Sequence, residues 1–250
     1  MAAGWLRSLA WIAAIGLLSA GPGPAGAAEG AGYADKRTRM VEVIQAHARS
    51  GYSRALAPGI AAPVLQAMGR VPRHEFVPRN LRNAAYQDRP LPIGYGQTIS
   101  QPYIVALMTD LLKVDPGDVV LEVGTGSGYQ AAVLADLDVQ VYTIEIVPEL
   151  GRQAAARLDR LGYDKARTRV GDGYYGWKEH APFDGIVVTA AANHIPPPLV
   201  RQLRPGGRMV IPVGEPFMVQ QLVLVTKKGD GTVQTRQLLP VSFVPLTGGH

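Results

Sequence analysis

The chain has 250 residues, of which 47% are hydrophobic and 18% charged, a composition that excludes disordered and fibrous proteins and fits one α/β domain with an appendage. Its 25 Lys and Arg against 20 Asp and Glu give a net charge of +5, but no long basic run marks a nucleic-acid-binding surface, so we expect no nucleic acid partner. The chain has no cysteine, which excludes disulfides, thiolate metal ligands and thiol nucleophiles.

Residues 1–27 have the organisation of a secretory signal peptide. Arg7 is their only charged residue, residues 9–20 form an apolar run, and the Ala-Gly-Ala of residues 25–27 offers a cleavage site. The run is too short for a permanent membrane anchor, so we expect an exported protein with no stable anchor. The alternative is a start site placed too far upstream, with Met40 as the true start and a cytoplasmic protein.

The part of the chain before residue 102 predicts short helices and loops. Residues 35–50 show an amphipathic helical pattern with Met40 and Ile44 on the apolar face, and residues 61–68 predict a second helix. The prolines of residues 71–78 indicate an extended connector, and the prolines and glycines of residues 90–97 indicate a loop.

The rest of the chain predicts a parallel sheet covered on both faces. Residues 102–112 predict a helix, and short apolar runs then alternate with helical patterns. The expected strands are 119–123, 139–144, 167–170, 185–189 and 208–213, and the expected helices between them are 129–137, 148–161 and 199–203. Two last strands, 221–226 and 233–239, are joined by a turn and predict a C-terminal antiparallel hairpin. We expect one doubly wound domain over residues 33–250, with residues 33–101 covering the substrate and residues 102–250 forming a Rossmann-like core.

Gly124, Gly126 and Gly128 stand on alternate positions where the first strand turns into a helix. Glycine there permits positive φ and close approach of a ligand. A dinucleotide fingerprint would need its third glycine at position 129, which is Tyr, and a phosphate-binding loop would need a lysine that is missing. With Glu122 just before the loop, the pattern predicts a nucleoside ligand without phosphate, S-adenosylmethionine, and includes Thr125 in its site.

Acidic residues at the ends of the next two strands extend the predicted cofactor site. Glu145 is placed where a carboxylate can accept both hydrogen bonds of a ribose diol. Asp172, followed by Gly173, could accept from the adenine amino group. A solvated strand end and an Asx turn are the alternative interpretations of these two acidic residues. Their placement at successive strand ends favours the cofactor.

Residues 85–103, with the sequence Ala-Tyr-Gln-Asp-Arg-Pro-Leu-Pro-Ile-Gly-Tyr-Gly-Gln-Thr-Ile-Ser-Gln-Pro-Tyr, carry a family resemblance together with the glycine loop, residues 171–173 and residues 243–247. From about residue 40 to residue 247 the chain resembles the protein-L-isoaspartate (D-aspartate) O-methyltransferase family. This resemblance implies the S-adenosylmethionine-dependent methyltransferase fold. It also implies methyl transfer to the free carboxylate of L-isoaspartyl and D-aspartyl residues in damaged proteins and peptides, which starts their repair through a succinimide.

The resemblance also implies roles for single residues. It makes Ser100 the active-site residue and places Gln97, Thr98 and Ile99 over the cofactor. Ser100 and Thr247 are the residues expected to contact the substrate.

A carboxylate acceptor simplifies the chemistry that the site must perform. With a pKa near about 4, the acceptor is ionised at neutral pH and needs no general base. Alignment with the methyl donor and exclusion of water are then the main requirements, which fits the lack of a His-Asp pair near the glycine loop. Ser100 would orient the acceptor by donating a hydrogen bond; the alternative is an N-cap ahead of Pro102.

Other polar residues give weaker indications. His74, His180 and His194, three of the five histidines of the chain, lack the spacing of metal ligands, so we expect no metal site. Arg73 and Arg89 are candidate partners of the substrate main chain or its carboxylates. Two other functions stay open: a methyltransferase for a small-molecule carboxylate or hydroxyl, and an inactive exported binding protein with the same fold. We expect a monomer.

Overall fold

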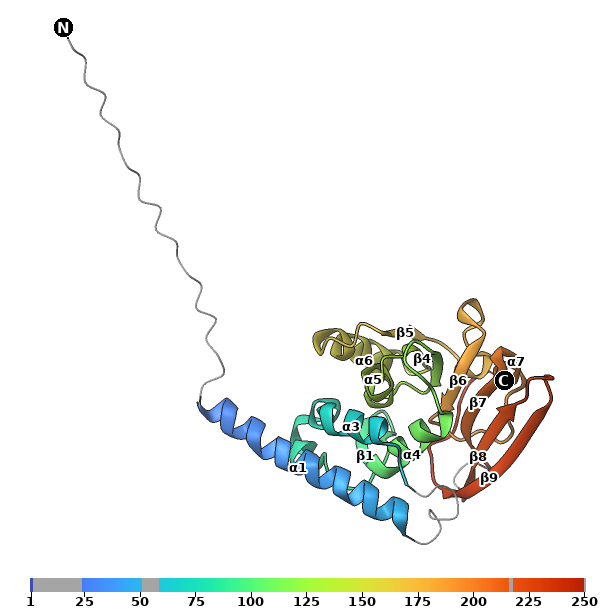
Figure 1. Cartoon of the computed structure of the whole chain (residues 1–250), viewed down its shortest axis with the longest axis horizontal. Coiled ribbons are helices and arrows are strands. Elements are labelled where there is room, and N and C mark those ends of the chain that lie inside the picture. The colour runs from blue at the N-terminus through green and yellow to red at the C-terminus, as the bar shows by residue number, and fades with distance from the viewer. Residues whose placement is uncertain (2–23, 51–58, 216–217, 250) are drawn as a thin grey trace.

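A seven-stranded sheet in the order β5-β4-β3-β6-β7-β8-β9 forms the centre of the computed structural model (Figure 1). The structure describes residues 1, 24–50, 59–215 and 218–249, with side chains described from residue 32 onward in the first helix. The strands are β3 Val119–Val123, β4 Gln140–Glu145, β5 Ala166–Val170, β6 Phe183–Val188, β7 Leu203–Val213, β8 Gln220–Lys227 and β9 Val233–Val241. Strands β3 to β7 pair in parallel, whereas β8 and β9 pair antiparallel, so the predicted sheet with its C-terminal hairpin is confirmed.

Both faces of the sheet are covered. The covering helices are α4 Pro102–Leu112, α5 Tyr129–Asp136, α6 Pro148–Arg160 and α7 Pro197–Gln202. Neighbouring residues of β3 divide between the two faces: Val120 belongs to one buried apolar cluster and Leu121 to another. A strand buried on both faces reads as a continuous apolar run, which is why β3 was evident in the sequence.

The order of the strands reverses direction beside β3. The chain runs outward from β3 to β4 and β5, then crosses back and places β6 on the other side of β3. The carboxyl ends of β3 and β6 therefore border the crevice at which open parallel sheets bind ligands.

The N-terminal part differs from its sequence prediction in three places. Its elements are α1 Pro24–Arg49, α3 Ala62–Arg70, the short 3-10 helices η1 Arg73–Phe76 and η2 Arg79–Ala84, and strands β1 Leu91–Gly94 and β2 Gln97–Ile99. Helix α1 begins eleven residues before the predicted start, and the connector predicted to be extended contains η1. The expected loop is an antiparallel hairpin, because Tyr95 and Gly96 both adopt positive φ, of 53° and 71°, in its two-residue turn.

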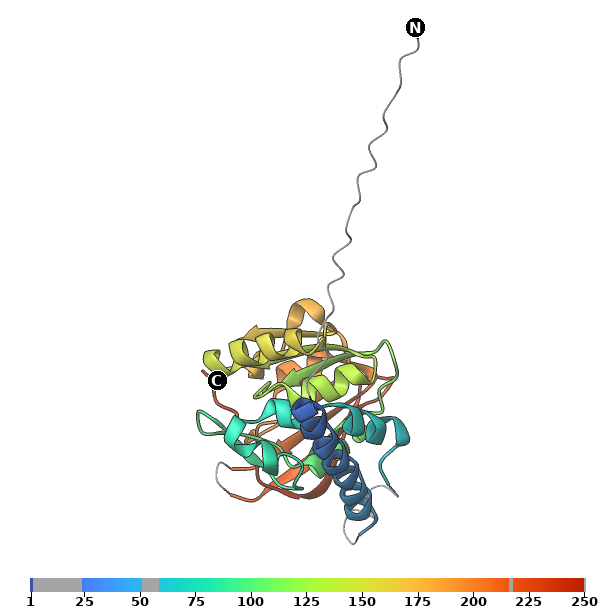
Figure 2. The ribbon, with the colours of Figure 1, turned by 90° about the vertical axis from the view of Figure 1, so that its left-hand side faces the viewer.

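The N-terminal part shares the core of the sheet domain. Met40 and Ile44 are fully buried, and their helix α1 lies against α3 and α4 (Figures 1 and 2). One apolar cluster runs without a break from Tyr33 of α1 to Leu238 of β9. Among the described residues, none of the helices has the length and hydropathy that crossing a membrane requires. The predicted signal peptide lies outside the described residues except for residue 1 and the first residues of α1.

Candidate active site

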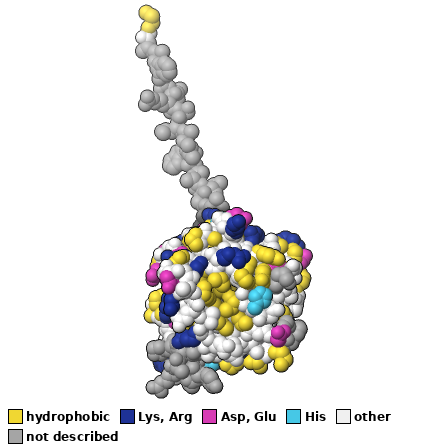
Figure 3. Space-filling view, turned by 90° about the vertical axis from the view of Figure 1, so that its right-hand side faces the viewer, with side chains coloured by type: hydrophobic (Ala, Val, Ile, Leu, Met, Phe, Trp, Pro, Cys, Tyr) yellow, Lys and Arg dark blue, Asp and Glu magenta, His cyan; other side chains and the backbone are white. Residues whose placement is uncertain are grey.

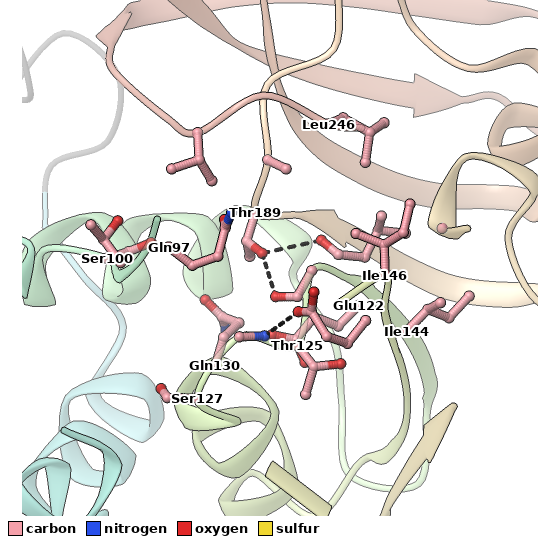
Figure 4. Close-up of a pocket in the computed structure, with 18 of the residues that line it drawn as sticks. Gln97, Ser100, Glu122, Thr125, Ser127, Gln130, Ile144, Ile146, Thr189 and Leu246 are labelled. Atoms are coloured by element: carbon pink, nitrogen blue, oxygen red, sulfur yellow. Dashed lines mark hydrogen bonds between the residues drawn. The ribbon is translucent and has the colours of Figure 1, made fainter. Parts of the chain in front are cut away.

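A pocket with an empty volume of about 760 Å³ opens at the carboxyl ends of β3, β4 and β6. In Figure 4, Gln97 and Ser100 approach this pocket from one side, and Ile144 and Ile146 lie on the other. Of the residues predicted from the sequence, those lining it are Gln97, Thr98, Ile99, Ser100, Glu122, Gly124, Thr125, Gly126, Glu145, Gly173 and Thr247. The fold thus brings residues from three strand ends, the β1-β2 hairpin and the C-terminal segment around one cavity.

The glycine loop passes close to the end of β6. Gly124 has a φ of 99°, and a Cβ added to it would lie 2.5 Å from Thr189 Oγ1. The Thr189 hydroxyl is within hydrogen-bonding distance of the carbonyl oxygen of Gly124, at 2.7 Å. Gly128 does not line the pocket; a Cβ there would lie 3.3 Å from Leu158, so this glycine allows α5 and α6 to pack closely.

Glu122 is fully buried at the floor of the pocket. Neither of its carboxylate oxygens has a hydrogen-bond partner among the described residues. Burial raises the pKa of Glu122 to about 8; the Thr143 hydroxyl, which is hydrogen-bonded to the Thr125 hydroxyl, opposes this shift, and the charge of nearby Glu145 adds to it. A buried acid of this kind is matched to a ligand that carries positive charge or a hydrogen-bond donor.

Glu145 ends β4 beside the glycine loop. Its Oε2 accepts a hydrogen bond from the backbone N–H of Gly126 at 2.7 Å, and its Oε1 accepts from Val147 at 2.9 Å. Each oxygen has a second lone pair, so the carboxylate can still accept from a ligand diol.

Asp172 lies outside the pocket lining, although Gly173 is part of it. The carboxylate of Asp172 accepts from the backbone N–H of Tyr174 at 3.0 Å and from that of Gly249 at 3.1 Å. The first bond is the Asx-type turn considered as the alternative in the sequence. The second attaches the C-terminal segment to the end of β5.

Ser100 lies between β2 and α4, and its position is fixed through its backbone. Nη2 of Arg73 donates to the carbonyl oxygen of Ser100 at 2.7 Å, and Nε of Arg73 donates to Ala85 at 2.7 Å. Arg73 is 0% exposed, so the expectation that it binds substrate is wrong. Its role in this structure is to fix the backbone at Ser100 by hydrogen bonding. The N-cap of α4 is Gln101, which removes the N-cap interpretation of Ser100.

A second, open cavity adjoins the pocket, with an empty volume of about 1200 Å³ that includes open solvent. The two share Thr98, Ser100, Thr189 and Val244. Apolar residues of β9 and the segment after it form much of its wall. Figure 3, which faces the right-hand side of Figure 1, shows apolar side chains gathered near the centre of that face of the molecule. We name this cavity the groove; Ser100 stands where the groove meets the pocket.

The segment after β9 lines both cavities. Ala191, next to the end of β6, donates to Val244 at 2.8 Å and accepts from Leu246 at 2.7 Å. The side chain of Gln220 holds the backbone of Phe243, whose N–H donates to Oε1 of Gln220 at 2.7 Å. Thr247 follows in this segment and lines the pocket but not the groove.

Several lining residues were not predicted from the sequence. They include Ser127, Gln130, Ile146, Thr189 and Leu246. Ile146 and Thr189 could have been found, because each follows the end of a parallel strand. Gln130 and Leu246 could not, since their approach depends on how a helix and the chain terminus pack.

A His-Asp pair lies away from the glycine loop. His47 Nδ1 and Asp88 Oδ2 are 3.0 Å apart, and His47 lines the groove together with Ser100. No group of three or more His, Asp or Glu among the described residues is arranged to hold a metal ion.

The pocket residues fit S-adenosylmethionine. The buried, unpartnered carboxyl of Glu122 suits the positive charge of that cofactor, and Glu145 suits a ribose diol. Gly124 leaves a space beside Thr189 that a Cβ would fill. The cofactor would be held by Glu122, Glu145, the loop 124–126 and residues 97–99.

Comparisons with known proteins show the family to which the chain is similar. A model of the family described as Protein-L-isoaspartate(D-aspartate) O-methyltransferase (PCMT) matches residues 57–250. The chain is 61% identical over 241 residues to Protein-L-isoaspartate O-methyltransferase 2 of Syntrophobacter fumaroxidans, covering 96% of this chain and 97% of that protein. It is 66% identical over 209 residues to the protein of the same name from Polaromonas sp., covering 84% and 99%.

A solved structure is similar over most of its length. It is a beta-aspartate methyltransferase (PCMT) from Plasmodium falciparum in complex with S-adenosyl-L-homocysteine. The TM-score is 0.69 at 26% sequence identity, and the match covers 84% of this chain and 98% of that one.

Proposed function

The chain belongs to the protein-L-isoaspartate(D-aspartate) O-methyltransferase family, and from this premise we propose which of its residues bind the cofactor and which hold the acceptor. The protein transfers the methyl group of S-adenosylmethionine to the free carboxylate of isoaspartyl residues in damaged polypeptides, the step that begins their repair. The observation that carries the assignment of residues is the position of Ser100, where the cofactor pocket meets the groove.

The cofactor side is assigned to residues of the pocket. The bound cofactor supplies an electrophilic methyl group on positively charged sulfur. We assign the charged end of the cofactor to Glu122 and its ribose diol to Glu145, with the loop 124–126 giving close backbone approach. Residues 97–99 cover the cofactor from the hairpin side. The proposed contact of Asp172 with adenine would require its hydrogen bond to Gly249 to be exchanged.

The acceptor side is assigned to the groove. A polypeptide lying in the groove can present its isoaspartyl carboxylate to Ser100 at the opening into the pocket. The Ser100 hydroxyl donates a hydrogen bond that orients the carboxylate for in-line attack on the methyl carbon, and the apolar wall excludes water. Thr247 lines the pocket but not the groove. The proposed contact between Thr247 and the substrate therefore requires the acceptor carboxylate to reach past Ser100 into the pocket.

The reaction is tested with a matched pair of peptides. We expect labelled methyl to pass from S-adenosylmethionine to an isoaspartyl peptide, as a base-labile ester, and not to its aspartyl twin. Equal labelling of both would contradict the assignment. A screen of small carboxylates and alcohols tests the second enzyme function, and tight cofactor binding without any ester would indicate a binding protein.

Substitution of Ser100 separates orientation of the acceptor from cofactor binding. Ser100→Ala should lower kcat about 10- to 100-fold, the range of one hydrogen bond to a charged group, with the cofactor dissociation constant nearly unchanged. Ser100→Thr keeps the hydroxyl and should recover part of the rate. A matching loss of cofactor affinity in Ser100→Ala would assign Ser100 to the cofactor instead.

We also propose that residues 1–27 are a secretory signal and that the mature chain is a monomeric single domain. Packing of Tyr33 in α1 favours a mature chain that begins before residue 33 over a start at Met40. The Tyr33 ring is buried and stacks on His74 with ring centroids 3.9 Å apart, a contact that a start at Met40 would remove. Mass spectrometry of the protein from fractionated cells should find Ala28 as the first residue; Met40 would contradict export. Sedimentation equilibrium tests the monomer.

A further inference from the structure

Helix α1, which is not part of the sheet, contributes to one wall of the groove. His47, near the end of α1, lines the groove together with Ser100. Its ring stacks on that of Tyr103, with centroids 4.0 Å apart and planes within 10°. Tyr103 belongs to the first turn of α4, three residues after Ser100. Among the described residues of α1, His47 is thus the one that lines the acceptor side of the site.

Asp88 fixes the orientation of this histidine. The Asp88 carboxylate accepts hydrogen bonds from the side chain of Gln101 at 2.9 Å and from the backbone N–H of Tyr103 at 2.9 Å. His47 Nδ1 lies 3.0 Å from Oδ2 of the same carboxylate. The carboxylate is mostly buried, with 13% of its side chain exposed, so these three partners hold it in one place.

The chemistry of the pair decides what His47 can offer to a ligand. An ionised carboxylate has no proton to give, so Nδ1 of the imidazole must be the donor. In the neutral ring, Nε2 is then an acceptor. Among the residues that the structure describes, Nε2 has no hydrogen-bond partner, and the side chain is 41% exposed. The ring thus presents a fixed acceptor at a half-exposed position on the groove.

We propose that His47 binds the main chain of the acceptor polypeptide by accepting one of its amide N–H groups at Nε2, so that α1 forms part of the acceptor site. The main chain is the one feature shared by damaged sequences, and it supplies N–H donors on both sides of the isoaspartyl residue. His47 lies before residue 57, where the match to the family model begins, whereas Asp88 and Ser100 lie within it. The inference rests on the proposed use of the groove by the polypeptide.

Two substitutions separate the ring nitrogens from the stacking. His47→Asn keeps a donor near the position of Nδ1 but has nothing at Nε2, and His47→Phe keeps the stack on Tyr103 without either nitrogen. The protein is loaded with S-adenosylhomocysteine, and binding of an end-capped isoaspartyl heptapeptide is measured by calorimetry. We expect both variants to bind the peptide about five- to tenfold more weakly, as for one uncharged hydrogen bond, with unchanged S-adenosylhomocysteine affinity. Glu42→Gln, an exposed change on the same helix, is the matched control.

Chemical changes to the peptide locate the partner. A series of peptides is prepared, each methylated at one amide nitrogen. One of these peptides should bind the wild type more weakly than the unmethylated peptide does, whereas His47→Asn should bind that peptide and the unmethylated one equally well. Peptide affinities within twofold of wild type in both variants, or a loss in His47→Asn but not in His47→Phe, would overturn the inference.

The outcome is independent of turnover, because no methyl group is transferred in the binding experiment. If the wild type methylates neither peptide twin, the proposed function fails, whereas the comparison of variants still decides the role of His47. If the wild type binds no peptide at all, the inference about His47 fails with it.

Discussion

Glu122 is an acid that the fold buries completely. Its carboxyl lies at the carboxyl edge of the sheet, buried and without a hydrogen-bond partner among the described residues, and Glu145 adds a second acid close by. A free carboxylate is costly in such surroundings unless a cation or donor arrives. A positively charged ligand would therefore stabilise the ionised carboxylate of Glu122.

The pH dependence of stability follows from this burial. Because folding raises the pKa of Glu122 from 4.5 to about 8, its contribution to stability is complete below pH 4.5 and is lost as the pH rises through about 8. The melting temperature of the ligand-free protein should fall across this interval, and fall less in Glu122→Gln. Thermal melts from pH 5 to pH 9 measure it. Equal slopes in the two proteins would contradict the assignment.

Arg73 places a full charge beneath the active-site loop. Its guanidinium satisfies the carbonyls of Ala85 and Ser100 and lies 4.8 Å from the centre of the Tyr129 ring. Burial lowers the pKa of Arg73, so part of the interaction energy offsets the loss of hydration.

Replacement of Arg73 should expose how much these bonds contribute. Arg73→Met keeps most of the volume but leaves the buried carbonyl of Ala85 and the partly buried carbonyl of Ser100 without these donors, so we expect a loss of about 2–4 kcal/mol in unfolding free energy. Arg73→Lys should lose less. Urea denaturation measures both; a methionine variant as stable as the wild type would show that the buried charge contributes no net stability.

At the scale of elements, the C-terminal segment closes the site by attaching to two strand ends. It bonds to Ala191 beyond β6, and Gly249 reaches Asp172 beyond β5. A Cβ on Gly248 would collide with the Asp172 carboxylate, so the segment passes close to this residue. Asp172 can therefore influence the cofactor through the segment that lines the pocket.

A double-mutant cycle distinguishes attachment of the segment from direct contact with the cofactor. Asp172→Ala and removal of residues 248–250 should each weaken cofactor binding several-fold, and the combination should weaken it no further. Calorimetric titration with S-adenosylhomocysteine measures the three proteins. Additive losses would instead assign Asp172 to the cofactor, as the sequence suggested.

At the scale of the whole molecule, α1 belongs to the same folding unit as the sheet. Met40 and Ile44 are buried in the cluster that extends to β9, and α1 packs on both α3 and α4. From Tyr33 onward, helix α1 thus shares the core of the sheet domain.

Two truncations test this organisation. Removal of residues 2–27 should leave the melting temperature close to that of the full chain. Removal of residues 2–50 deletes the buried Met40 and Ile44 and should cost more than about 4 kcal/mol, a fall of roughly 10 °C or more. Calorimetric melts compare them; equal melting temperatures would mean that α1 contributes nothing to the core.

The sequence by itself determined the parallel sheet, the glycine loop and the placement of Glu122 and Glu145 at strand ends. These features are local: a continuous apolar run indicates a strand buried on both faces, and glycines at a strand-to-helix turn indicate positive φ. Topology then brings strand ends together at one edge. The hairpin β1-β2 was missed because the prolines and glycines of residues 90–97 indicate a loop, whereas Tyr95-Gly96 forms the turn of a short hairpin.

Only the tertiary structure decided the contacts that join distant segments. Asp88 meets His47 from 41 residues away, Arg73 reaches Ser100 across 27 residues, and Gly249 reaches Asp172 across 77. A sequence pattern states how a residue is buried and which backbone conformation it favours, but not which residue lies opposite it. That depends on how α1, the hairpin and the C-terminal segment pack against the sheet, so many residues that line the pocket could be predicted from the chain, whereas the groove could not.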